Sequence, residues 1–365
     1  MIAFIVGTTA ELIKIAPVFH ELAGPRGRNC EIWYTGQHVE ELDGTLRDLE
    51  LPAPAEWLVP EADAKNLARV ADVPGWAARL ARTVLRNRAR LAERLRSDGQ
   101  PAIVLVHGDT FTAPLGAYIG RRLGARVGHV EAGERSGSLR HPFPEELNRR
   151  TAARVVDVHF ASSASQAWNL RHARGAVVVI GANTVVDAVN YALDRPSPPA
   201  VDLPEEYAVS TLHRFELVRH EGLYREALEI LKEYSEKLPI IYFAGASERE
   251  RLTEYGLLDM FDGERFRIED KLSYVRFMPV LAGARFVVTD SGGLQGETAH
   301  LGIPVAIHRA RAEVMDAEGE SWVLTRFDSA RLRAFLDDPE RYRSVGTRGQ
   351  VHPSKVIGDT IDLLG

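Results

Sequence analysis

Two histidine–carboxylate pairs stand in the first half of the chain, in the sequences HGD (107–109) and HVE (129–131). In each pair the two side chains are two residues apart, so they share one face where the backbone is extended. A histidine and a carboxylate together can bind zinc, iron or manganese, or can exchange protons with a substrate. The alternative is a pair of hydrogen-bonded core histidines beside solvated acids. The residues alone leave these three interpretations open.

A charged stretch, VEAGERSGSLRHPFPEELNRR, occupies residues 130–150. Its charged residues include four glutamates and four arginines, namely Glu131, Glu134, Glu145, Glu146, Arg135, Arg140, Arg149 and Arg150. As a solvated loop, these groups would pair weakly with one another. In an active site, crowded carboxylates push their pKa values apart, so that one stays protonated while another acts as a base.

The segment TDSGGLQGETAHLG (289–302) follows an apolar run and begins a helical pattern. Ser291, Gly292 and Gly293 would present backbone N–H groups at a helix N-terminus, where a phosphate is stabilised. Glu297 could accept hydrogen bonds from a ribose diol. The alternative is an ordinary turn with a serine N-cap.

Two further segments could serve a phosphorylated ligand. GTTAELIK (7–14) is a second glycine loop, and Lys14 falls about one turn into the following helix. It matches neither a Walker A sequence nor G-x-G-x-x-G, and no nicotinamide fingerprint occurs elsewhere. STLHRFE (210–216) places His213 and Arg214 after a strand, where a guanidinium could hold a diphosphate. A solvated lysine and a structural histidine are the alternatives.

Short apolar runs alternate with helical patterns along the whole chain, which predicts an α/β protein with parallel sheets. The predicted helices include 10–22, 76–95, 114–123 and 221–237, with a last one at 356–364. Ligands of such sheets bind beyond the C-terminal strand ends, where polar residues or glycines recur in this sequence. The predicted strands are 2–6, 31–35, 102–107, 126–130, 158–162, 176–180, 207–211, 239–244, 284–290 and 304–308.

The length of 365 residues favours two domains. A proline-rich segment, LDRPSPPAVDLPEEY (192–206), predicts the crossing between them. We expect an N-terminal domain over 1–190, to which a C-terminal helix at 352–365 returns, and a nucleotide-binding domain over 191–351. A cleft between these domains is the expected site.

Composition narrows the class of partner. The net charge of -6 disfavours binding to nucleic acid. The single cysteine, Cys30, excludes an intrachain disulfide and a cysteine-based zinc site. We find no signal peptide and no apolar run long enough to cross a membrane, so a cytoplasmic location is expected.

Taken together, these motifs resemble the non-hydrolysing UDP-N-acetylglucosamine 2-epimerases of bacteria. The family order G-T-R-P-E-x-I-K, T-G-Q-H-x-E-M-L-D, H-G-D-T, H-V-E-A-G-x-R-[ST]-G, P-E-E-x-N-R, G-H-R-R-E and T-D-S-G-G-x-Q-E-E is matched from about residue 2 to about residue 310. The corresponding segments here are GTTAELIK, TGQHVEELD, HGDT, HVEAGERSG, PEELNR, TLHRFE and TDSGGLQGE.

The resemblance implies a GT-B fold of two Rossmann-like domains, a UDP-sugar substrate, no metal and no cofactor. It also implies epimerisation at C2 through elimination and re-addition of UDP, with a 2-acetamidoglucal intermediate. Asp109, Glu131, Glu145, His213 and Lys14 would be the catalytic residues. Of the remaining charged residues at 130–150, Glu134, Glu146 and most arginines are expected only to pair and to position the loop. The expected substrate-binding residues are Thr8, Thr9, Gln37, His38, Arg135, Arg214, Phe277, Ser291, Gly292, Gly293, Glu297 and Arg309.

Several positions depart from the family pattern. Thr9-Ala10 replaces an Arg-Pro, Phe215 replaces an arginine, and Gly296 replaces the first acid of Q-E-E. AEVMD (312–316) stands where T-E-R-P-E is usual, and AGASERE (244–250) lacks the expected histidine. A hydrolysing epimerase, an epimerase of another UDP-amino sugar, a GT-B glycosyltransferase and a non-catalytic UDP-sugar-binding homologue therefore remain alternatives. A homodimer is the statistical expectation.

Overall fold

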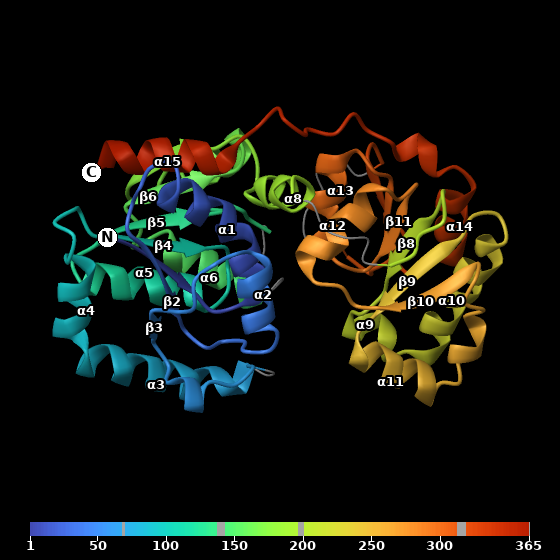
Figure 1. Ribbon diagram of the computed structural model, residues 1–365, viewed down its shortest axis with the longest axis horizontal. Coiled ribbons are helices and arrows are strands. Elements are labelled where there is room, and N and C mark those ends of the chain that lie inside the picture. The colour runs from blue at the N-terminus through green and yellow to red at the C-terminus, as the bar shows by residue number, and fades with distance from the viewer. Residues whose placement is uncertain (68–69, 137–142, 196–200, 312–318, 365) are drawn as a thin grey trace. The chain divides into compact units, whose positions relative to one another are not determined.

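The computed structural model describes residues 1–67, 70–136, 143–195, 201–311 and 319–364. Arg140 and the AEVMD segment lie outside these residues. The chain forms two compact units, the first from Met1–Ala188 together with Val351–Gly365 and the second from Val189–Gln350. Each unit is an α/β structure with one parallel sheet, which confirms the predicted fold class (Figure 1).

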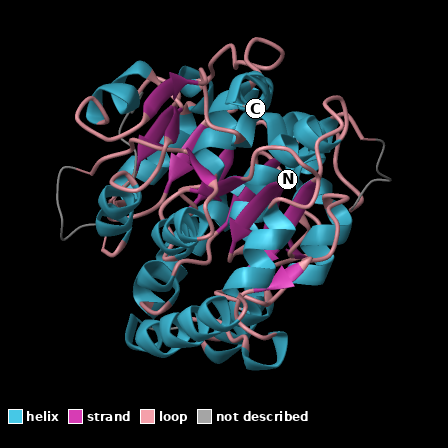
Figure 2. Cartoon of the chain, turned by 90° about the vertical axis from the view of Figure 1, so that its left-hand side faces the viewer, coloured by secondary structure: helices cyan, strands magenta, loops and turns pink. Residues whose placement is uncertain are grey.

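The first unit contains a seven-stranded sheet in the order β3-β2-β1-β4-β5-β6-β7. All its pairings are parallel. Figure 2 shows the helices that surround these strands. The strands are β1 (Ile2–Val6), β2 (Cys30–Tyr34), β3 (Glu56–Trp57), β4 (Ile103–His107), β5 (Arg126–Val130), β6 (Val158–Ala161) and β7 (Ala176–Val179).

Alternate side chains of the central strands enter different cores of the first unit. Ala3 and Ile5 of β1 belong to the cluster that includes Trp76 and Leu80 of α3. Phe4, which lies between them in sequence, contacts Phe19 of α1 with ring centroids 5.4 Å apart. This two-residue period explains why a strand covered on both faces reads as a continuous apolar run. The helices are α1 (Thr9–Ala23), α2 (Leu42–Asp48), α3 (Val73–Arg86), α4 (Arg88–Leu95), α5 (Thr112–Arg122), α6 (Glu145–Ala152), α7 (Ala164–Asn169), α8 (Val185–Leu193, which crosses into the second unit) and α15 (Pro353–Leu364).

One predicted helix is wrong in its extent. The segment 76–95, for which the sequence predicts a single helix, is divided between α3 and α4 at Asn87. The Asn87 side chain donates a hydrogen bond to the Thr83 carbonyl. Asparagine interrupts helices in this way because its amide competes for backbone hydrogen bonds.

The second unit contains a six-stranded parallel sheet in the order β10-β9-β8-β11-β12-β13. Apolar residues of β8, β9 and β11 pack against α10 and α14 in its main core. The strands are β8 (Ala208–Thr211), β9 (Ile240–Ala244), β10 (Phe266–Asp270), β11 (Val287–Thr289), β12 (Val305–Ile307) and β13 (Trp322–Leu324). The helices are α9 (Phe215–Val218), α10 (Glu221–Ser235), α11 (Ala246–Glu254), α12 (Tyr274–Ala282), α13 (Leu294–Leu301) and α14 (Ser329–Asp337).

The ten predicted strands are confirmed, with ends that differ by a few residues. The sequence does not predict three strands, β3, β10 and β13, and each lies at the edge of its sheet. Among the described residues, no helix combines the length and the apolar character that crossing a membrane requires.

Candidate active site

The charged site of the first unit is built from the ends of β4 and β5 and from α1 and α6. Lys14 of α1 donates to Glu131 Oε2 from 2.7 Å, and Asn183 Nδ2 donates to the same oxygen from 2.8 Å. His107 Nε2, at the end of β4, lies 3.2 Å from that oxygen. The Glu131 backbone has a φ of 61°, in the left-handed region that is rare for residues other than glycine. Three groups of the first unit therefore converge on one carboxylate.

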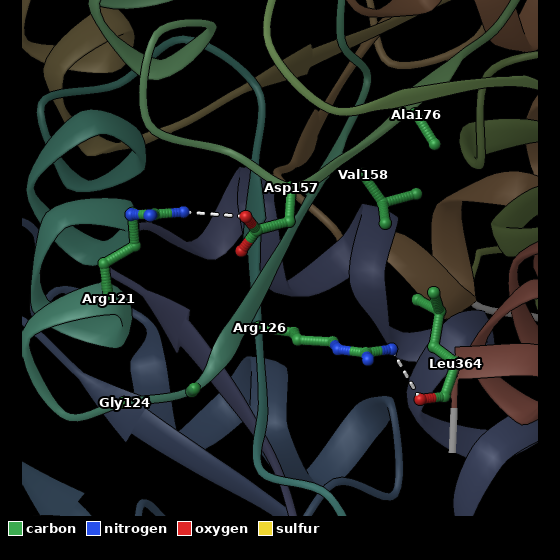
Figure 3. Close-up of a pocket in the computed structure, with 8 residues that line it drawn as sticks. Arg121, Gly124, Arg126, Asp157, Val158, Ala176 and Leu364 are labelled. Carbon is green, nitrogen blue, oxygen red and sulfur yellow. Dashed lines mark hydrogen bonds and ion pairs between the residues drawn. The ribbon is translucent and has the colours of Figure 1, made fainter.

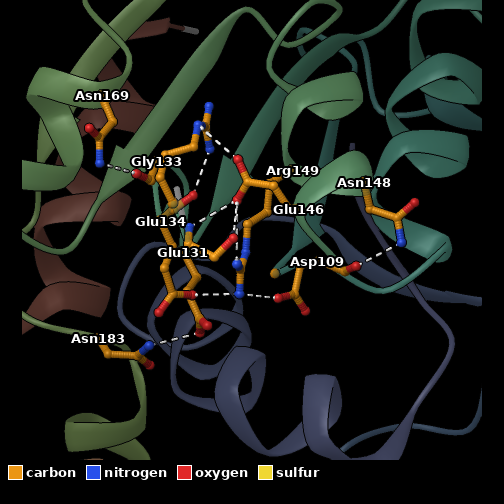
Figure 4. A network of polar contacts seen from close by, with 12 residues as sticks. Asp109, Glu131, Gly133, Glu134, Glu146, Asn148, Arg149, Asn169 and Asn183 are labelled. Atoms are coloured by element: carbon orange, nitrogen blue, oxygen red, sulfur yellow. Dashed lines mark hydrogen bonds and ion pairs between the residues drawn. The ribbon is translucent and has the colours of Figure 1, made fainter. Parts of the chain in front are cut away.

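Arg149 of α6 joins two further carboxylates in this site (Figure 4). Its Nη2 donates to Asp109 Oδ2 from 2.5 Å and to Glu134 Oε2 from 3.1 Å. The neighbouring Asn148 donates from Nδ2 to the Asp109 carbonyl. Asn148 and Arg149 of the PEELNR motif thus hold the loop that carries Asp109. The sequence analysis expected most arginines of this stretch to position the loop but assigned no role to Asn148.

The charges and burial around Glu131 and Glu134 shift their pKa values in opposite directions. Burial by itself would raise the pKa of Glu131, but Lys14 and His107 outweigh it, so this pKa lies well below its ordinary value. In the opposite direction, burial and the charge of Glu131 raise the pKa of Glu134 to about 7, although Arg149 opposes the rise. Burial would lower the pKa of Lys14, but the carboxylates around it raise that pKa. Near neutral pH the site therefore holds an ionised acid and an acid that binds a proton, the combination that proton transfer needs.

Glu134 pairs with Arg149, in agreement with the sequence interpretation of it as a group that pairs and positions the loop. Its side chain is 21% exposed, and it shares Arg149 with Asp109. Glu146 also matches the expectation of a loop-positioning group. It is fully buried and accepts hydrogen bonds from the Ser136 N–H and from Arg150 Nε.

Glu145 and Arg135 come from the same charged stretch. Glu145 is the first residue of α6 and is half-buried. Arg135 donates to the Glu134 carbonyl from 2.7 Å, and burial lowers the pKa of its guanidinium. The structure therefore links Arg135 to the loop backbone.

The two histidines of HGD and HVE have different environments. His107 faces the Glu131 carboxylate. His129 Nε2 lies 2.7 Å from the Gly108 carbonyl, and burial lowers the pKa of His129 to about 4. His129 is thus a neutral core histidine that fixes the Asp109 loop. Within the described ranges, no cluster of three or more histidine, cysteine, aspartate or glutamate side chains has the arrangement of a metal site.

The glycine loop before α1 contributes a buried acid that sequence reasoning missed. Glu11 accepts hydrogen bonds from the N–H groups of Gly7 and Thr8 and from Thr110 Oγ1. Thr8 is the N-cap of α1 and forms a capping box with Glu11. Burial raises the pKa of Glu11 in spite of these donors. The S/T-x-x-E spacing in TTAE (8–11) is the signal that could have revealed this pair.

The other candidate residues near this loop have mixed environments. Gln37 is buried, and its Oε1 accepts a hydrogen bond from Thr112 Oγ1 at 3.0 Å. Thr9, the first residue of α1, and His38 are half-buried. The structure therefore gives Gln37 a role in packing the loop and leaves the side chains of Thr9 and His38 partly accessible.

In the second unit, Asp290 organises the strand-end loops. It is fully buried and accepts hydrogen bonds from the backbone N–H groups of His213 and Arg214. His213 Nδ1 also lies 3.3 Å from Asp290 Oδ1. Burial raises the pKa of Asp290 even though His213 lowers it. Asp290 thus positions His213, a function that the sequence did not assign to it.

The loop after β11 leads into α13 as predicted. The helix begins at Leu294 with Gly293 as its N-cap, so a serine N-cap is not present. The Ser291 N–H donates to Thr289 Oγ1, which leaves the N–H groups of Gly292 and Gly293 as candidate phosphate donors. Glu297 follows in the first turn of α13 and is 6% exposed.

Two more predicted binding residues of the second unit contact neighbouring side chains. The ring of Phe277 in α12 packs edge-to-face on Phe243, with centroids 5.3 Å apart. Arg309 donates from Nε to Glu216 at 2.9 Å. Each is held in place by its contact, and substrate binding by Phe277 and Arg309 stays a prediction.

A pocket of about 480 Å³ lies elsewhere in the first unit (Figure 3). Arg126, Val158 and Ala176, at the N-terminal ends of β5, β6 and β7, contribute to its wall. Asp109 and Glu131 follow the C-terminal ends of β4 and β5, at the opposite ends of the strands. The pocket is therefore separate from the acidic site.

The chain matches the family model described as UDP-N-acetylglucosamine 2-epimerase over residues 20–334. It is 30% identical over 351 residues to the UDP-N-acetylglucosamine 2-epimerase of Bacillus subtilis, covering 93% of this chain and 88% of that protein. The corresponding Escherichia coli protein is 28% identical over 338 residues, with 85% and 82% covered.

Solved structures give the same result for the fold. The UDP-GlcNAc 2-epimerase of Methanocaldococcus jannaschii in complex with UDP-GlcNAc and UDP has a TM-score of 0.72 and 25% identity, covering 100% of this chain and 99% of that one. The Neisseria meningitidis enzyme bound to UDP-GlcNAc has a TM-score of 0.74 and 24% identity, with 99% of both chains covered. Both similarities agree with a GT-B type fold. On the family match and these relatives, the chain belongs to the UDP-N-acetylglucosamine 2-epimerase family.

Proposed function

We propose that this protein interconverts UDP-N-acetylglucosamine and UDP-N-acetylmannosamine without hydrolysis. Family membership supports the reaction type, and the solved structure of the Neisseria meningitidis enzyme is a complex with UDP-GlcNAc. The observation that carries the proposal is the acidic site, where ionised Glu131 is held by Lys14 and Asp109 is held by Arg149.

The proposed chemistry follows from the position of the reacting hydrogen. The proton on C2 of the sugar is not adjacent to a carbonyl, so it cannot be removed by simple enolisation. A carboxylate takes this proton while the C1–O bond breaks and UDP leaves with the bonding electrons, giving a C1=C2 double bond. Re-addition of UDP at C1 and of a proton to the other face of C2 then gives the epimer. Proton transfer is most efficient when the pKa of the transferring group lies near the working pH.

We assign the proton-transfer roles to Asp109, Glu131 and Glu145, with Lys14 and His213 serving the acid/base step or the diphosphate. These five residues are proposed as catalytic. In the second unit the N–H groups of Gly292 and Gly293 are proposed to bind phosphate, and Glu297 to bind the ribose. The proposed reaction uses no metal and no cofactor.

Exchange at C2 in heavy water tests the proposal. Incubation with UDP-N-acetylglucosamine in D₂O should give UDP-N-acetylmannosamine with deuterium at C2, observed by proton NMR and mass spectrometry. Absence of both deuterium and epimer would contradict the proposal.

One observation favours a hydrolysing reaction as a second candidate. The first residues of α1 are Thr9 and Ala10, so an arginine that could retain the departing diphosphate is absent there. Free UDP and N-acetylmannosamine as the main products of the same incubation would support hydrolysis. A cytoplasmic homodimer also belongs to this proposal, and light scattering coupled to size-exclusion chromatography tests the dimer.

A further inference from the structure

Glu134 occupies a position that the family motif H-V-E-A-G-x-R leaves open, so the motif assigns it no role. It also lies inside the acidic site. Arg149 Nη2 is 3.1 Å from Glu134 Oε2 and 2.5 Å from Asp109 Oδ2, so one nitrogen serves both carboxylates. The Arg149 side chain is 8% exposed, which limits replacement of either partner by water.

A purely structural role does not account for this carboxylate. The loop is held by the Glu134 main chain, whose carbonyl accepts from Arg135. It is also held by Glu146, which accepts from the Ser136 N–H and from Arg150. The Glu134 side chain instead extends to the cation that orients Asp109.

We propose that Glu134 is a positioning residue for Asp109, sharing Arg149 with it and thereby setting how basic the Asp109 carboxylate is. When Glu134 is ionised, Arg149 Nη2 is divided between two carboxylates and Asp109 binds a proton more readily. When Glu134 is protonated, Nη2 serves Asp109 as its one ionised partner, with Glu146 3.8 Å from the other terminal nitrogen, and Asp109 becomes a weaker base. The inference rests on the proposed function, because there Asp109 transfers a proton.

The groups that face Glu134 within the described residues come from four places. They are Lys14 of α1, Asp109 after β4, Glu131 of its own loop and Arg149 of α6. Glu146 lies 3.8 Å from Arg149 Nη1 and pairs more closely with Arg150. Asp109, Glu131 and Glu134 thus lie near the cations Lys14 and Arg149, and Glu134 and Asp109 compete for a proton through Arg149.

The test compares wild-type protein with Glu134→Gln and Glu134→Asp in the rate of C2 exchange as a function of pH. Glutamine keeps the shape of the side chain but cannot ionise, so Asp109 should remain the weaker base at every pH. In the wild type we expect an ascending limb of the kcat profile near pH 7, where Glu134 ionises, and Glu134→Gln should lose this limb. The plateau kcat should fall about tenfold, because a weaker base removes the proton more slowly. KM should change less than about twofold. Glu134→Asp should keep the wild-type limb.

Two results would overturn the inference. One is a Glu134→Gln profile identical to that of the wild type. The other is a lower kcat with an unmoved limb, as a packing defect would give. Glu61→Gln, which removes an exposed acid of the same unit, is the matched control for charge.

A second measurement separates this inference from the proposed function. The carboxyl carbon of Asp109 can be titrated by ¹³C NMR in the protein without substrate, before and after Glu134→Gln. The wild-type Asp109 signal should shift again near pH 7, as Glu134 ionises, and Glu134→Gln should lose this step. A step that is absent from the wild type, or that Glu134→Gln retains, refutes the coupling whether or not the enzyme turns over. Wild-type protein that shows this coupling but no C2 exchange would contradict only the epimerase assignment.

Discussion

The two units present different polar groups at the C-terminal ends of their strands. In the first, the strand ends carry charged side chains, with Glu131 and Asp109 held by Lys14 and Arg149. In the second, the N–H groups of Gly292 and Gly293 follow β11 at the start of α13, and the buried carboxylate of Asp290 holds the His213 loop. Charged side chains can move protons, whereas fixed N–H groups bind an anion without titrating. Apart from His213, the comparison therefore predicts kcat defects for the first unit and KM defects for the second.

The largest expected effect tests the catalytic half of this comparison. Glu131→Gln removes the carboxylate on which Lys14, Asn183 and His107 converge. We expect kcat for C2 exchange to fall by about 10²–10⁴, the usual contribution of an acid/base group, with little change in KM. Glu61→Gln serves as the control. A tenfold rise in KM with an unchanged kcat would reverse the assignment of tasks.

The next effect tests the binding half. Glu297→Gln in α13 keeps the size of the side chain but weakens its hydrogen bonds to a ribose diol. Since a hydrogen bond to a charged group contributes about 1.5–3 kcal/mol, KM and the Kd of UDP should rise roughly tenfold or more, while kcat stays within about threefold. Calorimetric titration with UDP measures the affinity, with the exposed Glu264→Gln as control. Loss of kcat alone would break the comparison.

A smaller effect concerns the pH profile of the first unit. Lys14→Met removes the main positive charge that lowers the pKa of Glu131, while burial continues to raise that pKa. The acidic limb of kcat/KM should therefore move to higher pH, by about one unit or more. Lys355→Met, at an exposed lysine of α15, should leave the limb in place. A shift to lower pH in Lys14→Met would contradict the charge assignment.

The smallest effect is on stability. The folded-state pKa of Glu134, about 7, lies above its ordinary value of 4.5, so the folded protein keeps a proton that the unfolded chain has released. The stability contributed by this group is therefore present at low pH and is lost as pH rises from 4.5 to 7. Glu134→Gln removes this loss. The difference in melting temperature between Glu134→Gln and the wild type should increase by roughly 2–4 °C from pH 5 to pH 8. A difference that does not change with pH would contradict the raised pKa of Glu134.

The sequence predicts the central strands well because burial on both faces makes them continuous apolar runs. β10, with the sequence FRIED, alternates partly exposed charges with apolar residues, and β3 and β13 have only two and three residues. All three are edge strands, so the pattern that identified the others was absent from them.

Within the candidate active site, the motifs indicated Glu131 and Asp109, which follow strand ends, and Lys14 in α1. The sequence could not predict that Glu134 would share Arg149 with Asp109, because this contact joins residues 15 and 40 positions away from the arginine. Asn183 reaches Glu131 over 52 positions for the same reason. Such partners depend on how the loops fold back, which local periodicity does not encode.

The return of α15 to the first unit has a consequence for biosynthesis. Arg26, just after α1, donates to Asp359 and Asp362 of α15, and α1 is also the helix that carries Lys14. Residues 189–350 of the second unit leave the ribosome before α15 does. A nascent chain can therefore complete its second unit while the helix bearing Lys14 still lacks α15 as a neighbour. The first unit is thus completed after the second.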